Sequence, residues 1–359
     1  MATPWYSILA DHEIFTPQLV VYPERIEANI DEMIRIAGTP DRLRPHVKTY
    51  KCREIIELQI ARGIHRFKCA TLAEAALLGE ASVADVLLAY PLIGPSQKRF
   101  LELRETFPRT KFSVLIDSAE QLTGWNAHQK SIDFFIDVNV GMNRTGASVS
   151  QCLDLFKQLD ASDHTLRGWH CYDGHNRLIE PHARENKMIT EFEPILSIIQ
   201  QTATESLELV TGGSITFPIH AQYPGRTLSP GTTLLWDHGY AHQFADLKLA
   251  VAAIVVTRIV SKPGADLVCL DAGHKAVASE MPADSLFFPE LPDARKVTHS
   301  EEHLVVKTSQ ADSLKVGQLM YGIPYHICPT VALHDSIGVI EDGRLTERWT
   351  IGARNRVYV

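Results

Sequence analysis

Between residues 43 and 236, short apolar runs rich in β-forming residues alternate with longer amphipathic stretches. This alternation constrains the fold more than any other feature, because it is typical of βα units that build a parallel sheet. The sequence predicts strands at residues 43–48, 66–70, 85–90, 111–117, 133–140, 166–172, 207–211 and 227–235, and helices at residues 52–62, 72–79, 95–106 and 182–200. Eight such strands favour a closed (β/α)8 TIM barrel over an open doubly wound sheet.

The pattern changes after about residue 244. Runs of β type at residues 247–260, 267–271, 304–308, 318–321 and 336–341 are separated by turn residues, with no convincing helix among them. Asp342-Gly343 is a hairpin signal, because both central residues of a type I′ turn need positive φ. We therefore predict a barrel over residues 20–245 and a mainly antiparallel β domain over residues 246–359, which residues 1–19 could join.

Charge and hydropathy exclude several classes of function. The formal net charge of -8 leaves no basic surface for nucleic acid, and no run approaches the ~18 apolar residues of a membrane span. The six cysteines form no CxxC pair, as expected of reduced thiols. We expect a cytoplasmic protein that acts on a small molecule.

A lysine stands at the end of the first predicted strand, in the segment Arg-Pro-His-Val-Lys-Thr-Tyr-Lys that starts at Arg44. Functional residues of a barrel lie at the carboxyl ends of its strands, so Lys48 is predicted at the mouth, with its neighbours alternating in and out of the barrel. A partly desolvated lysine has a lowered amine pKa, as a nucleophile that attacks carbonyl groups requires. A merely solvated basic strand end is the alternative for this segment alone.

Two loops at the same mouth are predicted to bind a phosphate. One follows the seventh strand and the other flanks the eighth, where barrels commonly place a phosphate site. Adjacent glycines let backbone N–H groups approach phosphate oxygens, and hydroxyl groups add donors. The candidate residues are Thr211, Gly212, Gly213, Ser214, Gly231 and Thr232.

The fifth and sixth strands end in further polar residues. Arg144 is placed to neutralise an anion in the mouth, whereas Tyr172 and His175 could stack on or bond to a flat cofactor. Each could instead be an ordinary interface residue.

A second type of site is predicted near the C-terminus. If His326-Ile327-Cys328 is extended, the imidazole and the thiolate point the same way and could share one cation. A site with these donors favours zinc over magnesium, because thiolate is a soft ligand.

These motifs together resemble the fold-type III pyridoxal-phosphate (PLP) enzymes that include alanine racemase, specifically their D-threonine aldolase and D-serine dehydratase branch. The segments that carry the resemblance are RPHVKTYK, DVNVGMNRTG, YDGH, TGGS, SPGT, DAGHK, SEEH and HICPTVALHD. The resemblance implies that Lys48 binds PLP as a Schiff base, that Arg144 and Tyr172 contact the cofactor together with His46 and His175, and that His326 and Cys328 bind a divalent metal (Zn, Mn or Mg). Tyr172 and His326 are also expected to take part in catalysis.

The resemblance is compatible with two reactions, which would use the same residues. In the first interpretation, which we prefer, a D-β-hydroxy-α-amino acid such as D-threonine is cleaved between Cα and Cβ to glycine and an aldehyde. In the second, Lys48 removes the Cα proton and hydroxide leaves, which converts D-serine or D-3-hydroxyaspartate to a 2-oxo acid and ammonia. Cys328 is typical of the dehydratases, whereas YDGH and PTVALHD are more similar to the aldolases.

A third interpretation is a PLP-binding protein without turnover. Such proteins are single barrels, and the additional residues after the barrel argue against it. We also expect a homodimer, because in two-domain members the site lies between barrel and β domain and a second subunit can complete its mouth.

Overall fold

The computed structural model of the chain describes residues 4–9, 14–280 and 284–356, which fold into two compact units. The barrel unit contains residues 33–48 and 56–231. The β unit contains residues 49–55 and 232–354 together with the chain before residue 33. Helices α1 (Pro23–Ala37) and α2 (Arg53–Ile60) have residues in both units.

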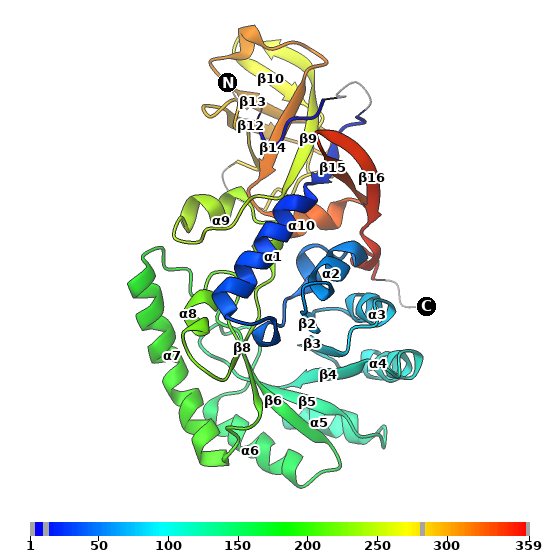
Figure 1. Cartoon of the computed structure of the whole chain (residues 1–359), viewed down its shortest axis with the longest axis vertical. Coiled ribbons are helices and arrows are strands. Elements are labelled where there is room, and N and C mark those ends of the chain that lie inside the picture. Colours follow the sequence, from blue (N-terminus) through cyan, green and yellow to red (C-terminus); the bar gives the residue numbers. More distant parts are fainter. Residues whose placement is uncertain (1–3, 10–13, 281–283, 357–359) are drawn as a thin grey trace. The chain divides into compact units, whose positions relative to one another are not determined.

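A parallel sheet forms the barrel unit (Figure 1). Its strands follow one another in the order of the sequence, which the βα rhythm predicts. They are β2 (Arg66–Cys69), β3 (Asp85–Pro91), β4 (Lys111–Ile116), β5 (Asp133–Asp137), β6 (Thr165–Cys171), β7 (Glu208–Thr211) and β8 (Arg226–Leu228).

The prediction of a continuous first strand at residues 43–48 is wrong. Leu43 and His46 make single parallel bridges to β8 and β2, and Val47–Thr49 then turn into one turn of 3-10 helix. The reason is Pro45. The N–H groups of Arg44 and His46 donate to the carbonyl oxygens of Leu228 in β8 and of Pro230, so the residue between them would have to donate to β2 on the other side. Proline has no N–H to donate. The segment nevertheless closes the ring, because the Lys68 N–H donates to the Pro45 carbonyl oxygen.

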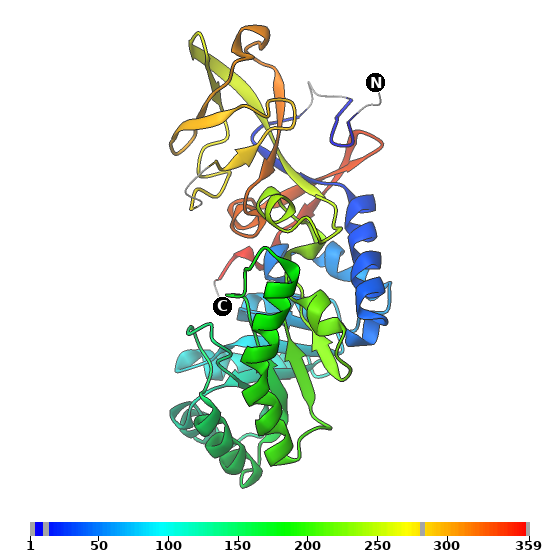
Figure 2. The same cartoon turned by 90° about the vertical axis from the view of Figure 1, so that its left-hand side faces the viewer.

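Helices connect the parallel strands. They are α3 (Leu72–Glu80), α4 (Pro95–Thr106), α5 (Ala119–Asn126), α6 (Val149–Asp160), α7 (Pro181–Thr202) and α8 (Phe217–Ala221). Among them, α3, α4 and α7 coincide with predicted helices. Several begin at a polar N-cap. Ser148 and Gln151, for example, form a capping box that satisfies the first free amides of α6. The long helix α7 comes to the front in Figure 2.

A buried ion-pair network lies inside the strand ring at its amino end. The Arg44 guanidinium, which is fully buried, bonds to both carboxylate oxygens of Glu208 at 3.0 and 2.8 Å and to Asp85 at 2.9 Å. These contacts join the closing segment to β7 and β3. Burial alone would raise the pKa of Asp85, but Arg44 and Arg167 hold it below its usual value.

The β unit contains a sheet in which most neighbours are antiparallel, although β1 and β15 pair in parallel. Its strands are β1 (Gln18–Val21), β9 (Ala253–Gly264), β10 (Leu267–Leu270), β11 (Leu286–Phe287), β12 (Arg295–His299), β13 (Leu304–Lys307), β14 (Leu319–Pro324), β15 (Ser336–Glu341) and β16 (Arg344–Thr350). The hairpin at Asp342-Gly343 is confirmed, with φ of 49° and 71°.

Two short helices also belong to the β unit, α9 (His238–Gln243) and α10 (Ile327–Leu333). The prediction of no helix after residue 244 is therefore wrong at α10. The segment is too short for a helical period to stand out in the sequence, and its start is fixed by a contact from elsewhere: the Asp237 carboxylate accepts from the Ile327 N–H at 3.1 Å.

Among the helices that the structure describes, none is long and apolar enough to cross a membrane.

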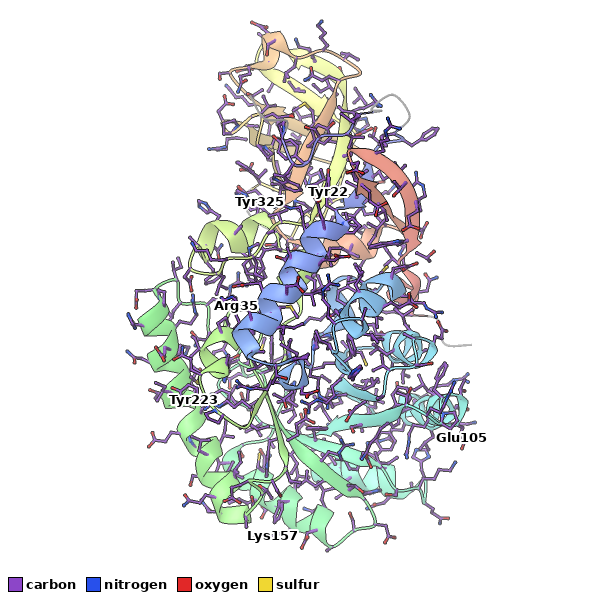
Figure 3. The ribbon with its side chains drawn as sticks, in the orientation of Figure 1. Tyr22, Arg35, Glu105, Lys157, Tyr223 and Tyr325 are labelled. Atoms are coloured by element: carbon purple, nitrogen blue, oxygen red, sulfur yellow. The ribbon has the colours of Figure 1, made fainter. Side chains whose placement is uncertain are left out.

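We predict that Arg44→Met lowers the free energy of unfolding by about 3 kcal/mol, since it leaves two largely buried carboxylates with weaker partners. The urea midpoint, followed by circular dichroism, measures this effect. Lys130→Met is the matched control. It removes the cation of an exposed ion pair with Glu105, labelled on α4 in Figure 3, and should leave the midpoint unchanged. Equal midpoints for Arg44→Met and the wild type would contradict the prediction.

Candidate active site

Lys48 lies in the 3-10 turn that follows the closing segment of the barrel and is half-buried. Its Nζ is 5.6 Å from the ring centroid of Tyr172, which comes directly after β6. The backbone N–H of Lys48 donates to the Nδ1 atom of His46 at 3.3 Å, so the buried His46 ring supports the turn. The structure thus brings Lys48 to the carboxyl end of the strands, although through a turn and not through a strand tip.

The ring of Tyr172 is the centre of this arrangement. The Arg144 guanidinium carbon lies 5.1 Å from its centroid, and a second lysine, Lys68, places its Nζ at 5.6 Å. Glycines make room for the ring: a Cβ atom on Gly213 would lie 3.0 Å from Tyr172 Cε2, and one on Gly174 would lie 2.2 Å from its hydroxyl oxygen. Two amines and a guanidinium therefore lie close to one aromatic ring.

A cavity of about 630 Å³ opens beside these residues within the barrel unit, a volume in the range of small-molecule sites. Its lining includes His46, Lys48 and Arg144, together with Tyr90 and Asp117. The surplus of positive charge fits an anionic ligand, and an amine, a guanidinium and an aromatic ring are the groups that a phosphorylated aromatic aldehyde such as PLP needs. The residues present therefore fit the cofactor that the sequence predicts.

The predicted phosphate-site residues from Thr211 to Gly231 lie in the barrel unit, whereas Thr232 belongs to the β unit. The amides of Gly213 and Gly231 are already engaged. Gly213 N–H donates to Thr216 Oγ1 at 3.1 Å, and Gly231 N–H donates to Ser214 Oγ at 3.2 Å. Thr211 Oγ1 donates to the Thr227 carbonyl oxygen, and Gly212 has a φ of +76°. These bonds shape the loops before any ligand binds.

Thr216 links the strand-7 loop to the strand-6 end. Its hydroxyl group donates to Asp173 at 2.7 Å, and the other carboxylate oxygen of Asp173 bonds to His220 Nε2 at 2.9 Å. All three side chains are buried. Because Asp173 follows Tyr172 directly, this network fixes the backbone at the ring.

His175 is directed elsewhere. Its Nε2 atom bonds to Glu191 of α7 at 2.9 Å, and Glu191 also accepts from Lys187 at 2.6 Å. Sequence reasoning placed His175 on the cofactor, but its hydrogen bond is to α7.

Sequence reasoning missed a chain of buried polar residues beneath Tyr172. His170 of β6 bonds through Nδ1 to Asp137 of β5 at 2.6 Å, and its Nε2 lies 3.4 Å from the Lys68 Nζ. The signal was a titratable residue at or next to the carboxyl end of each of three strands, where the preceding residue is apolar.

The predicted metal ligands lie in the β unit. His326 has extended backbone, but Cys328 lies in the first turn of α10, so the prediction of a fully extended His-Ile-Cys segment is wrong. The two side chains nevertheless lie close enough for each to shift the pKa of the other. The Cys328 sulfur also contacts the hydroxyl oxygens of Thr49 at 3.2 Å and Thr232 at 3.3 Å. In the chain these two threonines follow Lys48 and Gly231 directly.

Electrostatics favour an ion pair between these two residues. Burial would raise the pKa of the Cys328 thiol, but the His326 ring and the two threonine hydroxyl groups lower it. Burial would lower the pKa of His326, but the contacts with Cys328 and Glu280 raise it to about 9. Thiolate and imidazole are donors that zinc accepts, and a carboxylate behind the histidine is typical of metal sites. The described residues contain no group of three or more His, Cys, Asp or Glu side chains that could hold a metal.

Comparison with known proteins identifies the family of the chain. The alanine racemase N-terminal domain family matches residues 21–237, and a putative serine dehydratase domain matches residues 252–340. A D-threonine aldolase from Arthrobacter sp. is 29% identical over 355 residues, which cover 94% of this chain and 92% of that protein.

Solved structures show the same fold. A D-threonine aldolase from Filomicrobium marinum superposes with a TM-score of 0.87 at 23% identity and covers 99% of this chain and 100% of that one. A metal-free cysteine-to-alanine variant of D-threo-3-hydroxyaspartate dehydratase has a TM-score of 0.79 at 18% identity, with 97% and 99% coverage. Since the alanine racemase N-terminal domain model matches more than half of its length, this chain belongs to the fold-type III family of alanine racemase-like PLP enzymes.

Proposed function

We propose that this chain is a lyase for D-β-hydroxy-α-amino acids that depends on PLP and a divalent metal, and that its reaction is the D-threonine aldolase reaction. The observation that carries the proposal is the meeting of Lys48, Arg144 and Tyr172 beside one cavity of the barrel unit. The likeness to an aldolase over almost the whole chain supports the choice of reaction.

The barrel residues would hold the cofactor. PLP, when bound, supplies a pyridine ring that accepts the electron pair left at Cα after a bond to Cα breaks. Lys48 offers the amine for covalent attachment, and the Arg144 guanidinium binds an anionic group. The strand-7 and strand-8 loops, with Gly212, Gly213 and Gly231, would contribute to the phosphate site.

The β unit supplies the second requirement of the reaction. Before Cα–Cβ cleavage, the β-hydroxyl group of the substrate must lose its proton. His326 and Cys328 would hold the cation that lowers the pKa of that hydroxyl group. The contact between these two side chains, the depressed pKa of the thiol and the metal-free form of the related cysteine variant support this role.

A dehydratase is the second candidate, because a specific observation favours it. A cysteine stands at position 328, and a D-threo-3-hydroxyaspartate dehydratase shares the fold. In that reaction Lys48 removes the Cα proton, the β-hydroxyl group leaves with help from the same cation, and the product hydrolyses to a 2-oxo acid and ammonia. A second subunit could complete the mouth of the site, so we retain the homodimer as a proposal.

The first prediction from the proposed function concerns the attachment of the cofactor. The purified protein should be yellow, and borohydride should fix the phosphopyridoxyl group on Lys48, the amine in the turn after the closing segment. Lys48→Ala should lose the absorbance band and the activity, whereas Lys51→Ala should keep the label. Peptide mass spectrometry identifies the labelled residue. Label on Lys51 or Lys68 would refute the assignment.

The second prediction concerns the metal. Chelation should abolish turnover and leave the PLP absorbance unchanged, because the cation acts on the substrate. His326→Ala and Cys328→Ser should each lower kcat/KM by about 100-fold or more, on the scale of a lost Lewis acid. Cys269→Ser in β10 is the matched thiol control and should retain activity. Full activity of His326→Ala after exhaustive EDTA treatment would contradict a role of this pair in metal binding.

The third prediction decides between the reactions. With Mn²⁺ or Zn²⁺ present, D-threonine should give acetaldehyde and glycine, measured by aldehyde reduction and amino-acid analysis. Pyruvate and ammonia from D-serine would instead support the dehydratase. The L-isomers should be inert, because a fixed carboxylate and cation let only one Cα configuration present the breaking bond. Efficient turnover of L-threonine would overturn the substrate class.

A further inference from the structure

Lys68 is a lysine that the proposed mechanism does not use. It lies in β2 and is only 2% exposed, although lysine is almost never fully buried unless it is paired. Among the described residues, no carboxylate lies within ion-pair distance of its Nζ, whose hydrogen-bond partner is the Nε2 atom of His170 at 3.4 Å. Such a residue needs a functional or structural reason.

The direction of that hydrogen bond follows from the next contact. His170 Nδ1 lies 2.6 Å from Asp137 Oδ1, and an ionised carboxylate can only accept. Nδ1 therefore carries the ring hydrogen, and Nε2 presents a lone pair to Lys68. The Lys68 amine donates one hydrogen to His170 and keeps further hydrogens for another acceptor.

Opposite charge is scarce around this amine. The cations of Lys48, Arg144 and Arg44 lower its pKa, and they are opposed by the carboxylate of Asp137, which already accepts from His170 and from Thr145. Arg44 is neutralised by its own carboxylates, but Lys48 and Arg144 are not in contact with any described carboxylate. Burial first, and the charge of Lys48 next, place the pKa of Lys68 well below its ordinary value.

We propose that Lys68 is an additional anion-binding residue of this site, whose amine takes up a proton when an oxyanion binds beside Tyr172. This inference rests on the proposed function. The oxyanion comes either from the cofactor or from the carboxylate of the substrate. The Lys68 Nζ lies as far from the Tyr172 ring centroid as that of Lys48, at 5.6 Å, so both amines face the same ring.

The coupling has a defined sign. A bound anion favours the charged form of Lys68 and raises its pKa, so binding takes up a proton at any pH between the pKa values of the free and the bound protein. Because linkage is reciprocal, affinity for the anion falls as pH rises through that same interval. A lysine with only a structural role would show no such proton uptake.

Calorimetry of PLP binding to the cofactor-free protein tests the inference. Titrations in buffers of different ionisation enthalpy give the number of protons taken up, and parallel titrations with pyridoxine 5′-phosphate, which has no aldehyde to react with Lys48, remove the contribution of covalent attachment. The wild type should take up more protons than Lys68→Met, by up to about one per site. Lys68→Met should also bind PLP about 10- to 100-fold more weakly, the range of a lost hydrogen bond to a charged group.

Two further variants keep the test decisive. Lys68→Arg keeps the charge without titrating, so it should bind PLP more tightly than Lys68→Met and lack the additional proton uptake. Lys111→Met removes an exposed lysine from β4 and should behave like the wild type. If Lys68→Met does not fold, as judged by circular dichroism, the comparison of Lys68→Arg with the wild type decides.

A second titration identifies the source of the anion. The holoenzyme is titrated with D-alanine, which carries the carboxylate of the substrate without its β-hydroxyl group. If proton uptake depends on Lys68 in the titration with PLP, the anion belongs to the cofactor. If it depends on Lys68 only in the titration with D-alanine, the anion is the substrate carboxylate. Equal proton uptake by the wild type and both Lys68 variants in both titrations overturns the inference. Failure of the wild type to bind PLP refutes the proposed function itself.

Discussion

Backbone hydrogen bonds and the buried Arg44 guanidinium hold residues 43–46 between β8 and β2, and the position of the candidate site depends on this closure. Pro45 limits pairing on the β2 side, so the segment cannot continue as a strand. It turns instead at Val47–Thr49, and the turn directs Lys48 toward Tyr172. The segment that contains this proline therefore determines where the Lys48 amine lies.

Charge is unevenly distributed along the barrel interior. At the amino end of the strands, Arg44 is matched by Asp85 and Glu208. At the carboxyl end, the amines and guanidinium around Tyr172 exceed the carboxylates that face them. Folding brings these like charges together at an electrostatic cost, and an anionic ligand offsets that cost. The barrel is thus stabilised at one end and prepared for an anion at the other.

The His326 and Cys328 pair shows how local conformation and side-chain contact can differ. The backbone changes from extended to helical between the two residues, yet their side chains meet. Thr49, Thr232 and Glu280 surround the pair with hydroxyl groups and a carboxylate. The His326 ring lowers the pKa of the thiol most, and the hydroxyl groups of Thr232 and Thr49, from segments remote in sequence, lower it further.

The sequence alone determined the order of β2 to β8 and the hairpin at Asp342-Gly343, and it identified Lys48, Arg144 and Tyr172 as candidate site residues, because periodicity, turn chemistry and motif spacing are local properties. It could not reveal the Lys68–His170–Asp137 chain, since these residues are separated by long stretches of sequence and meet only when neighbouring and opposite strands form the ring. Nor could it show that the Thr216 hydroxyl group donates to Asp173, or that α10 begins at Ile327 against Asp237. Those features depend on tertiary contacts, which decide where each polar group finds its partner.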